Sequence, residues 1–198
     1  MEHYFTAKPQ SQREPLQFTV ELFNREFRFT TDAGVFSKTE IDPGSLLLIS
    51  VLPVKAGDRV LDLGCGYGPI GIAAAYLAGP AGSVDMVDIN QRAVELAQSN
   101  SVLNGLINVR VWQSDGFSDV DGTYDWIVTN PPIRAGKKVI YPMVEQAFWH
   151  LRPGGGLLVV IRTKQGAKSM EQKMESVFNN VETVKMKKGY RVLKSVKP

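Results

Sequence analysis

The sequence contains very few of the residues that form disulfides and metal sites. Its 198 residues include one cysteine, Cys65, and two histidines, His3 and His150. A single cysteine cannot form an internal disulfide, and these three residues cannot assemble a His/Cys metal site. We therefore expect neither a disulfide nor a structural metal.

Long apolar runs are also missing. No run approaches the roughly 20 apolar residues of a membrane span, and the N-terminal stretch "MEHYFTAKPQ" lacks the apolar core of a signal peptide. We therefore expect a cytoplasmic protein that does not contact membranes. Hydrophobic residues make up 43% and charged residues 22%, which is ordinary globular usage, and the length suits one domain with a full core.

Positive charge is concentrated at one end of the chain. Residues 162–198 hold ten Lys or Arg against three Asp or Glu, whereas residues 1–161 hold thirteen against seventeen, and the net charge is +3. This distribution leaves two interpretations open. The basic end is either a solvated helix and edge strand or a surface that contacts a polyanion.

Periodicity predicts an α/β protein with an N-terminal hairpin. Residues 17–31 alternate apolar and polar positions around Asn24-Arg25-Glu26, which indicates a β-hairpin, and Asp42-Pro43 begins an apolar run typical of a helix start. From residue 59 onward, strand and helix signals alternate, which predicts a parallel sheet covered on both faces. We expect strands at 59–63, 83–88, 109–113, 125–129, 156–162, 181–187 and 190–196. We expect helices at 69–78, 90–103, 141–151 and 165–179.

A glycine-rich segment, "VLDLGCGYGPIG" (60–71), lies where the first strand of the main sheet hands over to a helix. Ligands bind at the carboxyl ends of parallel strands, where glycines allow close approach of the backbone and the next helix presents free N–H groups. Gly66, Gly68 and Gly71 also match the dinucleotide pattern, and Asp88 follows seventeen residues later. An NAD-binding interpretation is therefore open at this point.

Three carboxylates at successive strand ends favour a different cofactor. Asp62, in "LDLGCG", would oppose a pyrophosphate but could pair, directly or through water, with a cationic amino-acid group. Asp88, in "VDIN", suits the two hydroxyls of a ribose in either cofactor. Asp115, in "SDGF", could receive an adenine amino group or could simply cap a turn. Taken together, they favour a cofactor that carries a positive charge.

These stretches, with "NPP" (130–132) and "LRPGGGLLVVI" (151–161), resemble the ordered motifs of class I S-adenosylmethionine (SAM)-dependent methyltransferases. The resemblance implies SAM as cofactor and a Rossmann-like, doubly wound α/β fold, with a seven-stranded, mostly parallel sheet whose last strand is antiparallel. It makes 41–198 the methyltransferase domain and 1–40 an extension with the hairpin. The cofactor-binding residues implied are Asp62, Gly64, Gly66, Gly68, Asp88, Ile89, Ser114, Asp115, Gly116 and Asn130.

The "NPP" motif follows the apolar run Trp126-Ile127-Val128. Its two prolines remove two backbone donors and fix two φ angles, so the segment from Asn130 to Ile133 is nearly rigid. An exocyclic amine or amide nitrogen is a poor nucleophile because its lone pair is delocalised. Two fixed acceptors, the Asn130 side-chain carbonyl and the Pro131 main-chain carbonyl, would orient it and stabilise the charge that develops during attack on a methyl group.

At this position the motif resembles amino-methyltransferases that act on adenine N6, cytosine N4, guanine N2 or glutamine. Many of them have an aromatic residue after the prolines, whereas this chain has Ile133, which leaves a purely apolar contact with the target plane. "NPPIRAGK" and "DAGVFSKTEIDPGSLLLISVL" (32–52) resemble the RsmC-type guanine-N2 methyltransferases of small-subunit ribosomal RNA. The implied catalytic residues are Asn130, Pro131, Pro132 and Ile133.

The resemblance implies ribosomal RNA or the small ribosomal subunit as partner. Arg134, Lys137 and Lys138 directly follow the motif and are candidates for flanking phosphates. Phe36 could stack on the target base and Lys38 could contact phosphate, although a core position for Phe36 is equally consistent with the sequence. The chain is expected to be a monomer or a homodimer.

Other functions remain open on sequence grounds. Within the same chemistry, the target could be a protein glutamine or a DNA adenine. An NAD-dependent oxidoreductase and a non-catalytic RNA-binding protein are alternatives from other classes. The carboxylates and the "NPP" motif speak against the last of these.

Overall fold

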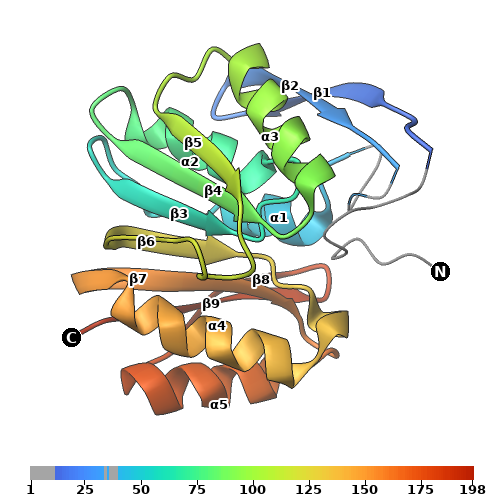
Figure 1. Ribbon diagram of the computed structural model, residues 1–198. Coiled ribbons are helices and arrows are strands. Elements are labelled where there is room, and N and C mark those ends of the chain that lie inside the picture. The colour runs from blue at the N-terminus through green and yellow to red at the C-terminus, as the bar shows by residue number, and fades with distance from the viewer. Residues whose placement is uncertain (1–11, 34, 36–39) are drawn as a thin grey trace.

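The computed structural model describes residues 12–33, 35 and 40–198. A seven-stranded sheet with the order β5-β4-β3-β6-β7-β9-β8 forms its centre (Figure 1). The strands are β3 (Arg59–Leu63), β4 (Ser83–Asp88), β5 (Val109–Gln113), β6 (Tyr124–Thr129), β7 (Leu151–Arg162), β8 (Glu182–Lys187) and β9 (Tyr190–Val196). β3 to β7 are parallel to one another, and β9 runs antiparallel to both β7 and β8. The predicted fold class is confirmed.

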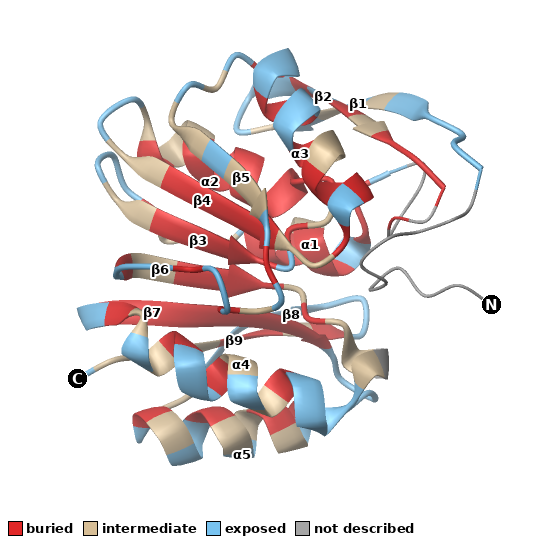
Figure 2. Cartoon of the chain, in the orientation of Figure 1, coloured by how far each residue is buried: buried red, intermediate tan, exposed pale blue. Residues whose placement is uncertain are grey.

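Helices cover both faces of this sheet. One face carries α1 (Pro43–Ile49), α2 (Pro69–Ala78) and α3 (Gln91–Leu103), and the other carries α4 (Lys137–Trp149) and α5 (Ala167–Phe178). Side chains of a strand alternate between the two faces, so Val60 belongs to one core and Leu61 to the other, and both are fully buried. The central strands are therefore buried on both sides, as Figure 2 shows.

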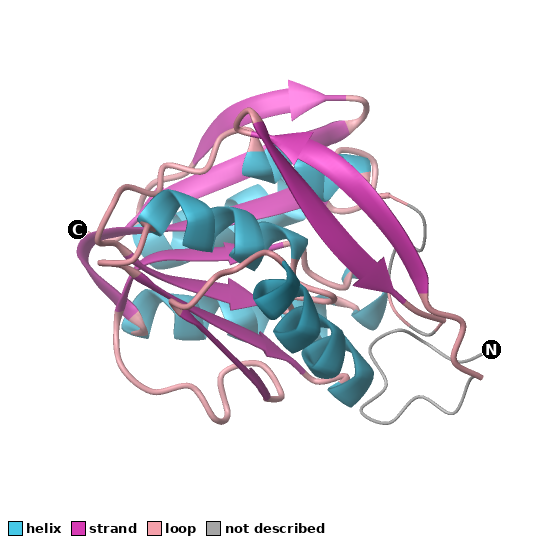
Figure 3. Cartoon of the chain, turned by 90° about the horizontal axis from the view of Figure 1, so that it is seen from above, coloured by secondary structure: helices cyan, strands magenta, loops and turns pink. Residues whose placement is uncertain are grey.

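The N-terminal hairpin forms a sheet of its own (Figure 3). It consists of β1 (Leu16–Leu22) and β2 (Arg25–Thr31). Its turn lies at Phe23 and Asn24, which have φ angles of 54° and 56°, one residue earlier than the predicted centre, because a two-residue turn with positive φ matches the twist of the strands. Phe27 and Phe29 are fully buried in the same core as α2 and α3.

Two predicted boundaries are wrong. α4 begins at Lys137 rather than 141, with Pro142 inside the helix; the carbonyl that loses its hydrogen bond there belongs to Lys138, an exposed residue that water can reach. β7 begins at Leu151 rather than 156, because Leu151 pairs with Tyr124 before a register shift. Among the described residues, no helix has the length and apolar character needed to cross a membrane.

Candidate cofactor and substrate site

A cavity of about 1000 Å³ opens at the carboxyl ends of β3, β4, β6 and β7. The segments that follow these strands and β5 line it, together with the beginnings of α1 and α4. Predicted residues that line it are Gly64, Gly66, Asp88, Ile89, Ser114, Asp115, Gly116, Asn130, Pro131, Pro132, Ile133 and Lys138. The sheet thus places five separate stretches of the chain, one after each of the strands β3 to β7, around the same cavity.

The glycine loop after β3 has a left-handed backbone that other residues rarely adopt. Gly64, Gly66 and Gly68 have φ angles of 74°, 58° and 95°. A Cβ on Gly64 or Gly66 would meet open space, so backbone conformation, not crowding, explains these two glycines. Gly68 precedes the first residue of α2, Pro69, and both Pro69 and Ile70 line the cavity, so the N-terminal end of α2, with its positive end of the helix dipole, faces it.

Asp62 lies behind this loop and not on the cavity wall. Its Oδ2 accepts a hydrogen bond from the Gly71 N–H at 2.7 Å, its Oδ1 has no partner among the described residues, and the side chain is fully buried. Burial raises the pKa of this carboxyl to about 7, and the Asp88 charge adds to the effect. Asp62 is not among the residues that line the cavity, so of the direct and water-mediated contacts predicted for it, the water-mediated one suits this position better.

The Asp88 side chain lies at the end of β4, binds the loops that follow β3 and β4, and lines the cavity. Its two carboxylate oxygens accept hydrogen bonds from Gly66 N and Asn90 N, each at 2.8 Å. Burial raises the pKa of Asp88, and the backbone donors of Asn90, Gly66 and Ile89 oppose that rise. The carboxylate therefore shapes the glycine loop as well as facing the cavity.

The turn after β5 is held by Ser114, which is buried. Its hydroxyl donates to the Gly116 carbonyl at 3.0 Å and accepts from Asp119 N at 3.1 Å. Asp115, between them, is exposed and lines the cavity. The serine fixes the loop, and the aspartate is the member of this turn available to a ligand.

Asn130 is oriented by residues that the sequence interpretation missed. Its side-chain amide Nδ2 donates to both oxygens of Asp42, at 3.4 and 3.3 Å, and to Ser45 Oγ at 3.1 Å. A carboxylate only accepts, so the amide nitrogen must face Asp42 and the carbonyl Oδ1 is directed elsewhere. Asp42 also caps α1 through Gly44 N and Ser45 N. The stretch "DPGS" signalled that cap, but nothing in it signalled the contact with Asn130.

The two prolines place the next turn. The Pro132 carbonyl accepts from Ala135 N at 2.8 Å and thereby closes the short helix η1 (Ile133–Ala135). Pro131 is buried and Ile133 is half-buried, and both line the cavity. The Pro131 carbonyl does not take part in this turn.

The predicted RNA contacts are only partly described. Lys138 is exposed and lines the cavity, whereas Lys137 lies with its ammonium 5.7 Å from the centre of the Tyr141 ring. Arg134 is described only in its backbone, and Phe36 and Lys38 lie outside the described residues. Sequence interpretation missed four cavity-lining residues from the C-terminal part of the chain, namely Ile161, Arg162, Gln165 and Tyr190.

Comparison with known proteins identifies the family. The family model of the methyltransferase small domain matches residues 26–194. The chain belongs to the methyltransferase small domain family. The prediction of a class I, SAM-dependent methyltransferase resembling the RsmC type is confirmed, and the glycine motif is that of a SAM-dependent enzyme rather than of an NAD-dependent oxidoreductase.

Several relatives of this methyltransferase cover most of the chain. The uncharacterized protein YbxB of Bacillus subtilis is 46% identical over 99% of the chain and 98% of its own length. The ribosomal RNA small subunit methyltransferase C of Vibrio parahaemolyticus is 36% identical over 89% of the chain, which spans 52% of that relative. A solved T. thermophilus 16S rRNA N2 methyltransferase (RsmC), in complex with AdoMet and guanosine, is 30% identical, with a TM-score of 0.84 over 96% of the chain and 52% of that protein.

Proposed function

We propose that this methyltransferase transfers a methyl group from SAM to the N2 amine of a guanine in the RNA of the small ribosomal subunit. The observation that carries the proposal is the orientation of Asn130, whose amide nitrogen is bound by Asp42 and Ser45. Its carbonyl is thereby available as an acceptor beside a rigid proline pair. Such an arrangement suits a target that donates N–H groups.

The cofactor half of the cavity lies over β3, β4 and the turn after β5. SAM supplies an electrophilic methyl group on a sulfonium. The left-handed glycine loop surrounds its methionine part, Asp88 accepts from the ribose hydroxyls, and Asp115 accepts from the adenine amine. The proposal extends to Asp62 through a water molecule, since the carboxylate itself is behind the loop.

The target half lies over the end of β6. Asn130 Oδ1 and the Pro131 carbonyl each accept one hydrogen bond from the target amine, which turns its lone pair toward the methyl group. As the new N–C bond forms, the bond between the methyl carbon and the sulfonium sulfur would break, and its electron pair would stay on the sulfur. The nitrogen would become positive, the two oxygens would stabilise that charge without moving, and the nitrogen would then lose one proton to solvent. Ile133 packs against the base plane as an apolar contact.

The choice of ribosomal RNA rests on the RsmC relatives and on the cations that follow the motif. Ribosomal RNA and SAM occur together in the cytoplasm, where we place the reaction. The same catalytic arrangement would also serve a protein glutamine or a DNA adenine, so the substrate is the part of the proposal that needs its own experiment.

Methyl transfer from tritiated SAM tests that substrate directly. The purified protein is incubated with 16S ribosomal RNA, assembled small subunits, duplex DNA and a peptide-release factor, and the labelled product is hydrolysed and identified by mass spectrometry. We expect label in N2-methylguanine from the RNA or the subunit. Label confined to DNA or to the release factor would overturn the substrate assignment while leaving the methyltransferase chemistry intact.

The variant Asn130→Ala tests the catalytic arrangement. We expect turnover to fall by roughly 100-fold or more, because one of two fixed acceptors is lost, while SAM binding stays within about two-fold of the parent value because the glycine loop and Asp88 are untouched. Calorimetric titration with SAM measures the binding. Parent-like turnover in this variant would remove Asn130 from the reaction.

A further inference from the structure

The cavity lies at the end of the sheet where the parallel strands finish, and the chain segments at that end are rich in Lys and Arg. Three segments meet there, namely the stretch from the end of β6 into α4 (131–144), the end of β7 with the start of α5 (162–170), and the β8–β9 hairpin (183–193). None of the three contains an Asp or Glu. Their exposed cations are Lys137, Lys138, Arg162, Lys164, Lys168, Lys185, Lys187 and Lys188.

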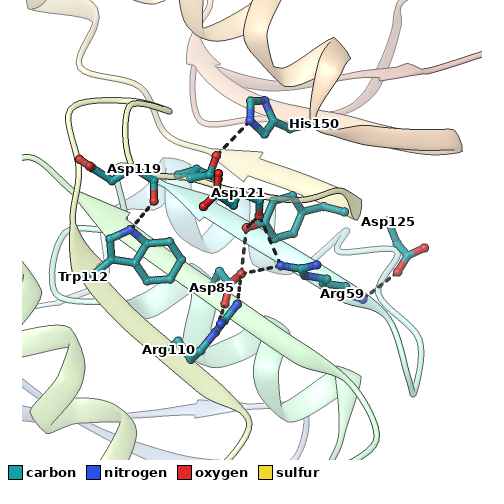
Figure 4. A network of polar contacts seen from close by, with 10 residues as sticks. Arg59, Asp85, Arg110, Trp112, Asp119, Asp121, Asp125 and His150 are labelled. Carbon is teal, nitrogen blue, oxygen red and sulfur yellow. Dashed lines mark hydrogen bonds and ion pairs between the residues drawn. The ribbon is translucent and has the colours of Figure 1, made fainter.

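At the other end of the sheet, where the parallel strands begin, arginines are paired with carboxylates. Arg59 and Arg110 both pair with the buried Asp85, at 3.3 and 2.9 Å, as Figure 4 shows. Arg152, at the start of β7, pairs with Asp125 at 2.7 Å. These three arginines are thus paired with neighbouring carboxylates. At the carboxyl ends Arg191 pairs with Glu171 at 3.7 Å, but Arg162, Lys187 and Lys188 have no ion pair with a carboxylate among the described residues, so the unpaired charge there is local to these three cations.

The tip of the β8–β9 hairpin lies directly beside the cavity. Arg162 is the register partner of Tyr190, and Thr163 N donates to the Gly189 carbonyl at 2.8 Å. The Arg162 guanidinium lies 4.8 Å from the centre of the Tyr190 ring, and both residues line the cavity. Lys187 is the register partner of Tyr190 and Lys188 follows it in the turn, so the two tip lysines lie beside a residue that lines the cavity.

We propose that the hairpin tip and Arg162, here called the basic rim (Arg162, Lys187 and Lys188), bind phosphates of the RNA strand next to the target nucleotide. This proposal rests on the proposed function, and it adds a binding surface to that site. A base that enters the cavity keeps its own backbone at the cavity mouth, so its neighbouring phosphates must lie at the rim. Lys138, which lines the same cavity from the start of α4, continues the positive surface.

The geometry of the rim suits phosphates. The two lysines are exposed point charges at a tight turn, and Lys188 has a φ angle of 50°. Stacking on Tyr190 restrains the Arg162 guanidinium while leaving its edge exposed. Because these three cations have no ion pair with a carboxylate among the described residues, RNA phosphates can serve as their counterions.

The test compares charge reversals at the basic rim with one charge reversal at the other end of the sheet, where the parallel strands begin. The rim variants are Lys187→Glu and Lys188→Glu, and the matched control is Lys55→Glu, an exposed lysine in the loop before β3. All three change the net charge by the same amount. Binding of the full chain to fluorescein-labelled 16S RNA is measured by anisotropy across a series of KCl concentrations, with SAM affinity measured in parallel.

We expect each rim variant to weaken RNA binding about 3- to 10-fold at moderate salt and to lower the slope of log K against log salt by about 0.7 for each phosphate that is no longer bound. The control should change both quantities much less, and SAM affinity should be unchanged in all three. Equal losses for rim and control variants would overturn the proposal, because net charge alone would then explain them. Loss of binding to phosphatidylglycerol vesicles without loss of RNA binding would also overturn it.

These outcomes are separable from failure of the proposed function. Binding is read without turnover, so a protein that binds RNA through the rim but methylates none would retain the rim and lose the catalytic proposal. Conversely, parent-like RNA binding in Lys187→Glu and Lys188→Glu, together with N2-methylguanine formation, would remove the rim and keep the function.

Discussion

The carboxylate of Asp42 serves two groups at once, the first turn of α1 and the amide of Asn130. The variant Asp42→Asn keeps the helix cap, because asparagine caps as well as aspartate. Its own amide nitrogen would face that of Asn130, and two donors cannot bond to each other. Asn130 would keep hydrogen bonds only to the carbonyl oxygen of residue 42 and to Ser45 Oγ, so a flipped amide with its nitrogen toward the target amine would compete with the active orientation. We expect turnover to fall roughly 10- to 100-fold with SAM affinity and thermal stability close to the parent values.

A double variant in which Asp42 and Asn130 exchange their side chains provides the control for the role of Asp42. In Asn130→Asp, two carboxylates face each other and activity is lost. In the double variant Asp42→Asn with Asn130→Asp, the asparagine donates to the new aspartate, whose second oxygen again accepts from the amine. We expect the double variant to turn over faster than Asn130→Asp alone, measured as methyl transfer at saturating SAM. No recovery would show that Asp42 does not orient residue 130.

The contact between Asp42 and Asn130 could not be predicted from the sequence. Asp88, Asp115 and Asn130 are predictable from motifs because each follows its own strand, and the parallel sheet brings strand ends to one edge. Asp42 lies 88 residues from Asn130 in the chain, and its local sequence indicates only a helix cap. A contact between side chains of distant segments leaves no periodicity, so the sequence alone could not predict it.

At the scale of elements, α3 pairs with the hairpin almost as a third strand would. Asn100 accepts from Thr30 N at 2.8 Å and donates to its carbonyl at 2.9 Å, and Asn104 does the same for Arg28 at 3.0 and 2.7 Å. One helical turn thus matches two residues of β2. The existence of hairpin and helix was predictable from their periodicities, but this docking was not, because a helix surface asparagine is ordinarily solvated.

This docking is testable with Asn100→Ala. Loss of the amide leaves the N–H and carbonyl of Thr30 without these partners, and frees the Tyr67 carbonyl in the glycine loop, to which Asn100 also donates at 2.9 Å. We expect the free energy of unfolding to fall by about 1–3 kcal/mol, with weaker SAM binding. Gln98→Ala, an exposed position on the same helix, is the control for urea unfolding and should change little. Equal stability of both variants would contradict the docking role.

At the scale of the whole molecule, the buried Asp62 makes stability depend on pH. Burial raises its pKa to about 7 in the folded chain, against an ordinary value of 3.8. Between these values the folded state holds a proton that the unfolded state has released, so the free energy of unfolding falls as pH rises from about 4 to about 7. Above pH 7 the folded chain retains a buried, ionised carboxylate with one unpartnered oxygen, Oδ1, and that charge is least favourable there.

The variant Asp62→Asn should remove this dependence. Its carbonyl can still accept from Gly71 N, and no charge is buried, so we expect it to be more stable than the parent at both pH 5 and pH 8, with an advantage about 2–3 kcal/mol larger at pH 8. Urea unfolding at both pH values measures the difference. We expect this gain to be accompanied by weaker SAM binding, because the neutral side chain no longer attracts the cationic amino group through water. A stability difference that is the same at pH 5 and pH 8 would contradict the raised pKa, and unchanged SAM affinity would leave Asp62 with a structural role alone.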